Sequence, residues 1–268
     1  MAQGRAEIKA LLDAHGLRPR RAFGQNFLAD PNLVDRIVRT AGVGPGDHVV
    51  EIGAGTGTLT VALAAAGADV VAYEVDQKLI PLLEEVLAPT GVDLRPVDAT
   101  KVDLGEDLGP GPWTMVANLP YNVGTPLVLD VLRNVPSVQR LIVMVQREVA
   151  DRFTAQPGTR VFGVPSVVVA LHTRSDIAFT VPPSVFYPAP DIESAVVVMD
   201  RVEPSPLSET AIELAGVAFR QRRKMLRRSL TDACDDAEGV LQEAGIDATA
   251  RPEDLEPGDF LRLAEVMA

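Results

Sequence analysis

Residues 48–67 read "HVVEIGAGTGTLTVALAAAG". A short β-branched run comes first, a glycine-rich loop follows, and an alanine- and leucine-rich helical pattern begins at Leu59. Gly53, Gly55 and Gly57 allow the backbone to turn tightly and to approach a ligand closely. The stretch therefore predicts a strand, a loop that binds a ligand and a helix in direct succession.

The same alternation of strand-like and helix-like segments continues along the chain. Helical patterns such as "LTVALAAAG" (59–67) and "QKLIPLLEEVLA" (77–88) separate the early strands. Such alternation, with strands that are apolar almost throughout, predicts an α/β fold with a parallel, Rossmann-like sheet of about seven strands covered by helices on both faces. The predicted strands are residues 48–53, 69–75, 93–99, 114–120, 140–146, 167–172 and 194–200.

The end of the chain has a different pattern. "RVEPSPLSET" (201–210) contains two prolines and is typical of a linker, and only helix-like segments follow it. We therefore expect a main α/β domain over residues 1–205 and a small all-helical domain over 206–268.

Composition limits the classes of function. The 268 residues are 47% hydrophobic and carry a formal net charge of -12, which by itself disfavours a nucleic-acid binder. The one cysteine, Cys234, excludes an internal disulfide, and the scattered histidines predict no metal site. Because no signal-peptide or membrane-spanning pattern is present, we expect a cytoplasmic protein that contacts no membrane.

Polar residues stand at the ends of four successive predicted strands. They are Glu51, Glu74, Asp98 and Asn118, at steps of 23, 24 and 20 residues. Because ligands of open parallel sheets bind outside the carboxyl ends of the strands, these four side chains predict one pocket. The alternative is that these polar residues only mark the ends of strands and bind no ligand.

The glycine loop and its acidic neighbours favour a nucleoside cofactor. The spacing is GxGxG, unlike the GxGxxG of dinucleotide-binding proteins, and no lysine follows as it does in a phosphate-binding loop. A carboxylate at Glu74 can accept hydrogen bonds from both ribose hydroxyls, and Asp98 can accept one from an adenine amino group. S-adenosylmethionine fits these parts. The structural alternatives are a solvated charge at Glu74 and a turn cap at Asp98.

The tetrapeptide Asn118-Leu119-Pro120-Tyr121 has the properties of an amine-binding loop. The amide oxygen of Asn118 and a backbone carbonyl of Leu119 or Pro120 can accept the two hydrogens of an exocyclic amine. Pro120 stiffens the loop, and Tyr121 offers an aromatic face to a base. These groups predict methylation of an adenine 6-amino nitrogen without a general base.

A base in a helix must be flipped out to reach such a pocket, between aromatic or apolar faces. The proline-rich stretch "VPPSVFYPAP" (181–190) supplies Phe186 as a candidate for the second stacking ring. Ordinary core packing of Phe186 is the alternative.

Seven motifs in order resemble one family. They are "GQNFLAD" (24–30), "EIGAGTG" (51–57), "YEVD" (73–76), "NLPYNVGTPL" (118–127), "QREVADRF" (146–153), "FYPAPDIESAVV" (186–197) and "QRRKMLRRSL" (221–230). The chain resembles the small-subunit (16S) rRNA adenine dimethyltransferases, whose loss gives kasugamycin resistance. The resemblance implies a Rossmann-like methyltransferase fold, S-adenosylmethionine as cofactor, and dimethylation of two adjacent adenines in the 3′-terminal hairpin loop of 16S rRNA within the 30S subunit.

The resemblance also assigns roles near the N-terminus. It places Asn26 and Leu28 in the cofactor pocket with Gly53, Gly55, Glu74, Asp98 and Asn118, and makes residues 1–30 a segment that covers the cofactor. Gln25 is expected to hold this segment in place. At Ala22 the family commonly has a basic residue, so an RNA contact is expected to be weaker there.

The positive charge of this acidic chain is clustered. In "RQRRKMLRR" (220–228) six of nine residues are basic, and Phe219, Leu226 and Leu230 recur at helical spacing. We expect a helix that presents its basic side to rRNA phosphates. The predicted RNA-binding residues are Arg220, Arg222, Arg223, Lys224, Arg227 and Arg228. Arg18, Arg20 and Arg21 form a second basic cluster.

Three other functions remain open at this point. Antibiotic-resistance methylases of 23S rRNA usually have Ile in place of Leu119, and DNA adenine methylases usually have Pro there. A ribosome-assembly factor that binds without methylating would not need the intact Glu74, Asp98, Asn118 and Tyr121. We expect a monomeric enzyme that acts on small-subunit rRNA.

Overall fold

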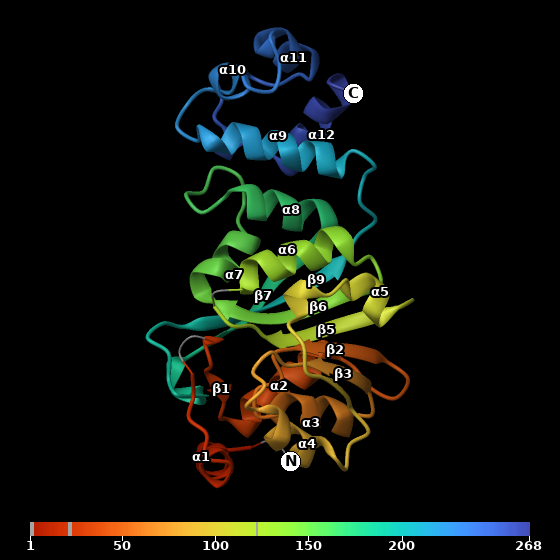
Figure 1. The fold of residues 1–268 in the computed structure, drawn as a ribbon. Coiled ribbons are helices and arrows are strands. Elements are labelled where there is room, and N and C mark those ends of the chain that lie inside the picture. The colour runs from red at the N-terminus through yellow and green to blue at the C-terminus, as the bar shows by residue number, and fades with distance from the viewer. Residues whose placement is uncertain (1–2, 21–22, 122) are drawn as a thin grey trace. The chain divides into compact units, whose positions relative to one another are not determined.

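The first of two compact units contains a seven-stranded sheet (Figure 1). We describe a computed structural model that covers residues 3–20, 23–121 and 123–268. The sheet strands are β2 (His48–Ile52), β3 (Asp69–Tyr73), β4 (Asp93–Arg95), β5 (Trp113–Asn118), β6 (Val138–Gln146), β7 (Thr173–Val181) and β9 (Ser194–Arg201). The α/β prediction and the number of strands are confirmed.

The strand order is β4-β3-β2-β5-β6-β9-β7. The pairs from β4 to β6 are parallel, whereas β9 lies antiparallel to β6. The order reverses between β2 and β5, because β3 and β4 lie on one side of β2 and later strands lie on the other. In a doubly wound sheet this switch point opens a crevice at the carboxyl ends of the two strands. Gly53 and Asn118 stand at those ends.

Helices cover both faces of the sheet (Figure 1). The amphipathic α2 (Pro31–Ala41) and the largely apolar α3 (Thr58–Ala65) pack on one face, in a core that includes Val49, Val70 and Val116. α4 (Ile80–Leu87) extends this layer, and α6 (Gly124–Asn134) packs against β6. α5 (Leu104–Leu108) and the short 3-10 helix η2 (Ala99–Lys101) lie between β4 and β5 in the chain.

A second, two-stranded sheet lies near the N-terminus. β1 (Phe27–Leu28) pairs antiparallel with β8 (Phe186–Tyr187), which follows the 3-10 helix η3 (Pro183–Val185). Helix α1 (Arg5–Ala14) precedes this sheet and packs Ile8 and Leu12 into a core with Phe27. Asp30 caps α2 by accepting the backbone N–H of Asn32, with Pro31 in the first turn, as the sequence predicted.

One predicted strand is wrong. Residues 167–172 belong to helix α8 (Val164–His172), and the strand lies just after it as β7. Pro165 in the first turn, and the side chain of Ser166 accepting the N–H of Gly163, start the helix. The valines of α8 are buried, because α8 packs against α9 (Ser208–Arg220) and α12 (Pro257–Val266). Tertiary packing therefore overrides the β propensity of the valine run.

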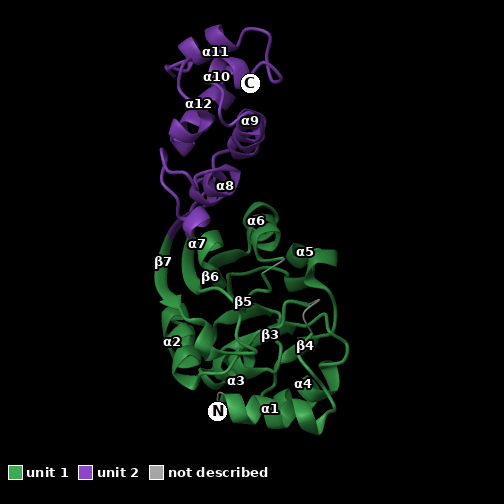
Figure 2. Cartoon of the chain, turned by 90° about the vertical axis from the view of Figure 1, so that its left-hand side faces the viewer, with its two compact units in different colours: residues 1–150, 176–200 green, residues 151–175, 201–268 purple. Residues whose placement is uncertain are grey.

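The second compact unit is helical (Figure 2). It consists of residues 151–175 and 201–268, so it also takes in α8, which the sequence reading placed in the first domain. Its core stacks the rings of Phe162, Phe219 and Phe260, with centroids 6.1 and 6.3 Å apart. α7 (Arg147–Phe153) leads into this unit, and its remaining elements are α10 (Leu226–Ser229), α11 (Ala237–Glu243) and η4 (Pro252–Asp254). None of the described helices is long and apolar enough to cross a lipid bilayer.

Candidate active site

A pocket lies at the carboxyl ends of β2, β3 and β5. Its wall combines the N-terminal segment, the glycine loop and the tetrapeptide after β5. It is lined by Phe23, Gly24, Gln25, Asn26, Phe27, Leu28, Glu51, Gly53, Ala54, Gly55, Thr56, Thr58, Leu59, Glu74, Val75, Asn118, Leu119, Pro120 and Tyr121. The structure thus brings together most of the residues that the sequence predicted as a site.

The glycine loop has the conformation that its residues predict. Gly53 and Gly55 have φ angles of +85° and +62°, which residues with a Cβ atom rarely adopt. A Cβ at Gly55 would also lie 3.0 Å from Cδ1 of Phe27. The backbone N–H groups of Gly53 and Ala54 donate to the carbonyl of Tyr73, so the loop is fixed to the end of β3.

Glu74 follows β3 and is 6% exposed. Its carboxylate accepts the backbone N–H of Gly55 at 2.8 Å and that of Asp76 at 2.8 Å. Burial raises the pKa of Glu74, and these two hydrogen bonds oppose the rise. A carboxylate has further lone pairs beyond these two, so Glu74 can still accept hydrogen bonds from a bound nucleoside.

The N-terminal segment is attached to the pocket through Asp76. This buried carboxylate accepts hydrogen bonds from Arg20 at 2.8 Å and from the Gln25 side chain at 2.7 Å. Gln25 also accepts the backbone N–H of Arg20. These bonds hold Asn26 and Leu28 at the pocket wall, as expected of Gln25. Arg21 and Ala22 lie outside the described residues.

The Asn118 side chain is oriented by the N-terminal segment. Its Nδ2 atom donates to the backbone carbonyl of Asn26 at 3.1 Å. Because the amide nitrogen is used in this way, the amide oxygen remains as an acceptor.

The carbonyls of the two following residues differ. The carbonyl of Pro120 accepts the N–H groups of Val123 and Gly124 at the start of α6. No described residue donates to the carbonyl of Leu119. Of the two predicted backbone acceptors, Leu119 is therefore the one whose carbonyl accepts no hydrogen bond from a described residue.

Tyr121 is half-buried, and its hydroxyl is 2.8 Å from Oγ of the buried Ser194 at the start of β9. Burial raises the pKa of this phenol, so it stays protonated at neutral pH. The bond fixes the direction of the ring between the pocket and a second opening. That opening is lined by Gly24, Gln25, Asn26, Tyr121, Gln146, Pro188, Ala189, Pro190, Asp191 and Ile192.

Asp98 lines an adjoining pocket instead of the first one. The two share Phe23, Gly53, Val75 and Pro120. Asp98 also accepts hydrogen bonds from the N–H and hydroxyl of Thr100, which lower its pKa. The turn-cap alternative is therefore confirmed, and the contact of Asp98 with an adenine amino group stays a prediction.

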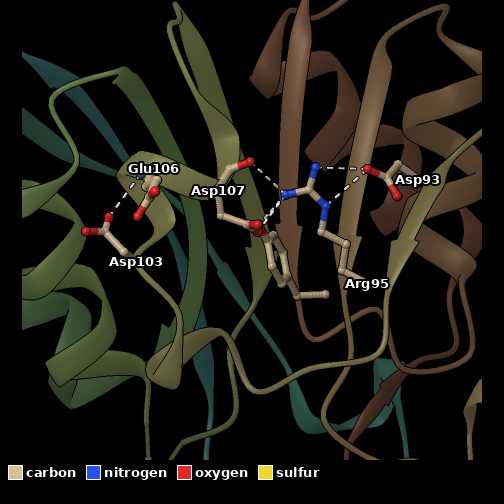
Figure 3. Close-up of polar contacts among 6 residues, drawn as sticks. Asp93, Arg95, Asp103, Glu106 and Asp107 are labelled. Atoms are coloured by element: carbon tan, nitrogen blue, oxygen red, sulfur yellow. Dashed lines mark hydrogen bonds and ion pairs between the residues drawn. The ribbon is translucent and has the colours of Figure 1, made fainter.

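Tyr73 forms part of the wall of this second pocket. Its hydroxyl donates to the carboxylate of Asp107, and Arg95 donates to the Tyr73 oxygen at 3.0 Å. Figure 3 shows the Arg95 guanidinium between Asp107 and Asp93, at 2.6 and 2.9 Å. The network fastens α5 to the edge of the sheet and holds the Tyr73 ring in place.

The chain matches the model of the family described as ribosomal RNA adenine dimethylase, over residues 16–268. It belongs to this family. Ribosomal RNA small subunit methyltransferase A of Streptomyces avermitilis is 43% identical to it, over 98% of this chain and 92% of the relative. The protein of the same name from Magnetococcus marinus is 42% identical, over 96% and 95% of the two chains. The prediction of a methyltransferase of this family is confirmed.

Solved structures agree on the fold of this dimethylase-family chain. The 23S rRNA methyltransferase ErmE superposes with a TM-score of 0.72 at 26% identity, over 90% of this chain and 99% of that one. A dimethyladenosine transferase from Plasmodium falciparum gives 0.74 at 24% identity, over 88% and 95%. The Rossmann-like methyltransferase fold is therefore confirmed.

Phe186 is not at the pocket in this dimethylase-family chain. Phe186 is 1% exposed and pairs with Leu28 in the two-stranded sheet. Its ring belongs to the core under α2 and α3. It lines none of the pockets described above. The prediction of a second stacking ring at Phe186 is wrong for this conformation, and the alternative of core packing holds.

The basic segment 220–228 is not a continuous helix. α9 ends at Arg220, a turn follows, and α10 begins at Leu226. Leu226 and Leu230 are fully buried, as predicted. The physical reason for the break is that the N–H groups of Leu226 and Arg227 pair with the carbonyls of Ala250 and Ala248 instead of with α9.

The six predicted RNA-binding side chains differ in their contacts. Arg222 donates to Glu253 at 2.5 Å and to the carbonyl of Arg160 at 2.7 Å, so it supports the fold of the second unit. Arg227 pairs with Glu238 at 3.0 Å. Among the described residues, no ion-pair partner is found for the exposed Arg220, Arg223, Lys224 and Arg228.

Several pocket residues were not predicted. Phe23, Val75 and Val97 give apolar walls to the two pockets, and only their nearness in the folded chain reveals this role. Glu51 was predicted to lie in the pocket, and it does line it, but the sequence assigned it no specific role there. The described residues include no group of three or more His, Cys, Asp or Glu side chains placed to hold a metal ion.

Proposed function

We propose that the protein transfers methyl groups from S-adenosylmethionine to the 6-amino nitrogens of two adjacent adenines in the 3′-terminal hairpin loop of 16S rRNA. The observation that carries this proposal is the arrangement after β5. The amide nitrogen of Asn118 is bound to Asn26, so its oxygen and the carbonyl of Leu119 remain as two neighbouring acceptors. Two acceptors suit an amine with two hydrogens.

The pocket fits a nucleoside with a positive charge and no phosphate. Among the described residues that line it, the charged ones are Glu51 and Glu74, and both are acidic. Glu74 would bind the ribose hydroxyls, and Asp98 would bind the adenine amino group in the adjoining pocket. When bound, S-adenosylmethionine supplies an electrophilic methyl group on a sulfonium.

The protein's own groups would raise the reactivity of the target nitrogen. The lone pair of an adenine amine is delocalised into the ring, which makes it a poor nucleophile. The Asn118 oxygen and Leu119 carbonyl bind both hydrogens and stabilise the positive charge that develops on nitrogen. The nitrogen forms its bond to the methyl carbon while the carbon–sulfur bond breaks with its electron pair going to sulfur, and the amine then loses a proton to water.

Tyr121 would hold the target base. Its hydroxyl is fixed by Ser194, so the ring has one orientation at the junction of the pocket and the second opening. Stacking of a base on an aromatic ring contributes about 1–3 kcal/mol. The stretch with Pro188 and Pro190 also lines that opening, and its apolar side chains would supply the second face that a flipped base needs.

We further propose that the second unit contributes phosphate contacts. Arg220, Arg223, Lys224 and Arg228 support this role, because they are exposed and have no ion-pair partner among the described residues. Their positive charge is concentrated in one short segment of a chain whose formal net charge is -12. The acidic remainder would repel phosphate and so limit binding elsewhere.

The small subunit is the substrate that the comparisons favour. The two bacterial relatives at 42–43% identity are named small subunit methyltransferases, whereas the 23S rRNA enzyme is 26% identical. Leu119 stands where the 23S enzymes usually have Ile. We propose a monomer that works in the cytoplasm during small-subunit biogenesis, since that is where the proposed substrate is assembled.

The proposal is tested with methyl-labelled S-adenosylmethionine and three substrates. Undermethylated small subunits should take up label, whereas free 23S rRNA and DNA should not. Label on 23S rRNA alone would overturn the assignment. Tight binding to the small subunit without label on any substrate would favour the assembly-factor alternative.

A further inference from the structure

Arg95 joins three elements on one side of the proposed cofactor site. It is the last residue of β4, which is an edge strand of the sheet. Its guanidinium donates to Asp93 at 2.9 Å, to the carboxylate of Asp107 at 2.6 Å and to the Tyr73 hydroxyl at 3.0 Å (Figure 3). Asp107 lies in α5, and Tyr73 ends β3. One side chain therefore links β3, β4 and α5.

The backbone of Arg95 is bonded to residues of both pockets. Its carbonyl accepts the N–H of Glu74 at 3.1 Å and the N–H of Val97 at 2.9 Å. Glu74 lines the first pocket, whereas Val97 lines the adjoining pocket together with Tyr73 and Asp98. Arg95 itself is not among the described lining residues of either pocket. Its effect on a bound nucleoside must therefore pass through these neighbours.

The segment between β4 and α5 supplies one wall of the adjoining pocket, through residues 97–100. The segment begins directly after Arg95, and it ends in the helix whose Asp107 the same arginine binds. The Arg95 guanidinium also donates to the backbone carbonyl of Asp107 at 3.0 Å. One residue thus holds both ends of a loop, which reduces the number of conformations that the loop can adopt without a ligand.

The contacts of the guanidinium are of the strong kind. Hydrogen bonds between an arginine and a carboxylate are charge-assisted, and they are stronger than bonds between neutral groups. The hydrogen bond from Tyr73, and after it the one from Arg95, lowers the pKa of Asp107, so this carboxylate is ionised at neutral pH. The Arg95 side chain is 25% exposed, so water screens the network only in part.

We propose that Arg95 is a positioning residue for the adenosine part of the cofactor. The inference rests on the proposed use of S-adenosylmethionine, with the ribose at Glu74 and the adenine in the adjoining pocket. The guanidinium holds the Tyr73 ring and the loop with Asp98 in place before adenosine binds. A preorganised loop loses less conformational entropy when its ligand arrives, so the affinity for the ligand is higher.

The experiment measures the Kd of three ligands by isothermal titration calorimetry. S-adenosylmethionine, S-adenosylhomocysteine and methylthioadenosine share the adenosine part, and the third lacks the amino acid part. Arg95→Met keeps the aliphatic stem and removes the guanidinium. It should weaken all three ligands by the same factor, about three- to tenfold, because the loop is then ordered only when the ligand binds.

Steady-state kinetics gives a readout that a loss of stability alone would not change in this way. In methyl transfer to undermethylated small subunits, Arg95→Met should raise the KM for S-adenosylmethionine by the factor found for Kd. Its kcat should stay within about twofold of the wild type, since the proposed amine clamp is untouched. Arg95→Lys restores the charge without the planar fork, so its affinity should lie between those of Arg95→Met and the wild type.

Arg140→Met is the matched control. Arg140 is also a strand arginine of the same sheet, and it pairs with Asp200 at 2.9 Å, but it is not among the described lining residues of either pocket. Its substitution should lower the melting temperature and leave the three Kd values unchanged. Circular dichroism checks folding. If Arg95→Met does not fold, Tyr73→Phe, which loses the bond from Arg95 but keeps the ring, makes the same comparison with an expected loss of about twofold.

The outcomes separate the inference from the proposed function. If none of the three ligands binds the wild-type protein, the proposed cofactor is wrong, and the inference falls with it. If the ligands bind the wild type and Arg95→Met equally well, the inference alone is wrong. Equal losses of affinity in Arg95→Met and Arg140→Met would also overturn it, because stability would then explain the effect. A loss confined to the two ligands with the amino acid part would contradict the assignment to adenosine.

Discussion

At the scale of single residues, one hydrogen bond gives Asn118 its proposed role. Its amide nitrogen is bound to the Asn26 carbonyl, so the orientation of the side chain depends on a residue 92 positions away in the chain. The sequence indicated Asn118 as an acceptor, but this bond and the use of the Pro120 carbonyl in α6 are tertiary facts. Together they favour the Leu119 carbonyl over that of Pro120 as the proposed second acceptor.

Asn118→Ala should abolish methyl transfer with little loss of cofactor affinity. We expect kcat to fall by at least about 10²-fold, because a preorganised acceptor of developing charge is lost, while cofactor Kd changes by less than about fivefold. Single-turnover assays and calorimetry measure the two quantities. Asn134→Ala, at the exposed end of α6, is the control. Near-full activity of Asn118→Ala would show that the proposed amine clamp is wrong.

Whether the Phe186 ring faces the core or a ligand could not be predicted from the sequence. An aromatic ring in a proline-rich stretch can stack on a ligand or fill the core, and the local pattern is the same in both cases. The two-residue strand β8 is too short for periodicity to separate its faces. Only the packing of the folded chain, in a core that also contains Leu28, shows that the ring is buried.

At the scale of elements, sequence patterns predicted the central strands well and the edge of the sheet poorly. The buried parallel strands are nearly continuous apolar runs, which are easily recognised. β7 is buried only at its two ends, alternates partly buried and exposed positions between them, and includes Arg174, Ser175 and Asp176. The neighbouring valine run of α8 has the stronger strand-like pattern, so the strand was predicted there instead.

The prediction of a continuous helix over the basic segment 220–228 was wrong for a related reason. Its residues favour a helix, but two backbone N–H groups pair with the chain near Ala248 and Ala250. Helix propensity is a weak preference that such contacts override.

The N-terminal segment is an element held by one carboxylate. Asp76→Asn weakens the charge-assisted bonds from Arg20 and Gln25, which should loosen the pocket wall at Asn26. We expect cofactor affinity to fall by about three- to tenfold, since hydrogen bonds to charged groups contribute about 1.5–3 kcal/mol when fully lost. Calorimetry measures this, with Asp130→Asn on α6 as the control. Unchanged affinity would mean that the segment does not depend on Asp76.

Two adjacent arginines should have different roles. Arg222→Ala breaks the bonds to Glu253 and Arg160 and should lower the melting temperature by about 2–4 °C, which corresponds to a loss of about 1 kcal/mol. Arg223→Ala should leave the melting temperature unchanged and weaken binding to the small subunit, with a shallower salt dependence. Differential scanning fluorimetry and filter binding give the comparison. Equal effects of the two substitutions on both readouts would contradict this division.

At the scale of the whole molecule, acidic and basic functions are separated along the chain. The pocket with its two glutamates belongs to the first unit. The four basic side chains for which the described part of the chain offers no ion-pair partner belong to the second. The net charge alone therefore disfavoured an RNA-binding function, whereas the clustering of positive charge favoured one. Carboxylates without counter-ions also affect the stability of the molecule as a function of pH.

The stability of the empty protein should fall as pH rises from about 5 to 8. The pKa of Glu51 is raised by burial from 4.5 to about 8, so in this interval the folded state binds a proton that the unfolded state has lost. Its contribution to the free energy of unfolding then decreases by up to about 1.4 kcal/mol per pH unit. Glu51→Gln should remove this slope, so the variant should gain stability relative to the wild type as pH rises.

Urea unfolding at pH 5.5, 6.5 and 7.5 measures the effect. Glu84→Gln, on the exposed side of α4, is the matched control and should follow the wild type at each pH. If the curves for wild type and Glu51→Gln run parallel across this range, Glu51 does not carry the raised pKa.

The most direct test of the central claim is to identify the methylated nucleosides made by the protein. Undermethylated small subunits are incubated with the protein and S-adenosylmethionine, and the 16S rRNA is digested and analysed by mass spectrometry. We predict N6,N6-dimethyladenosine at two adjacent positions of the 3′-terminal hairpin loop. Methylation at another site or on another base, or products that stop at N6-methyladenosine, would contradict the account.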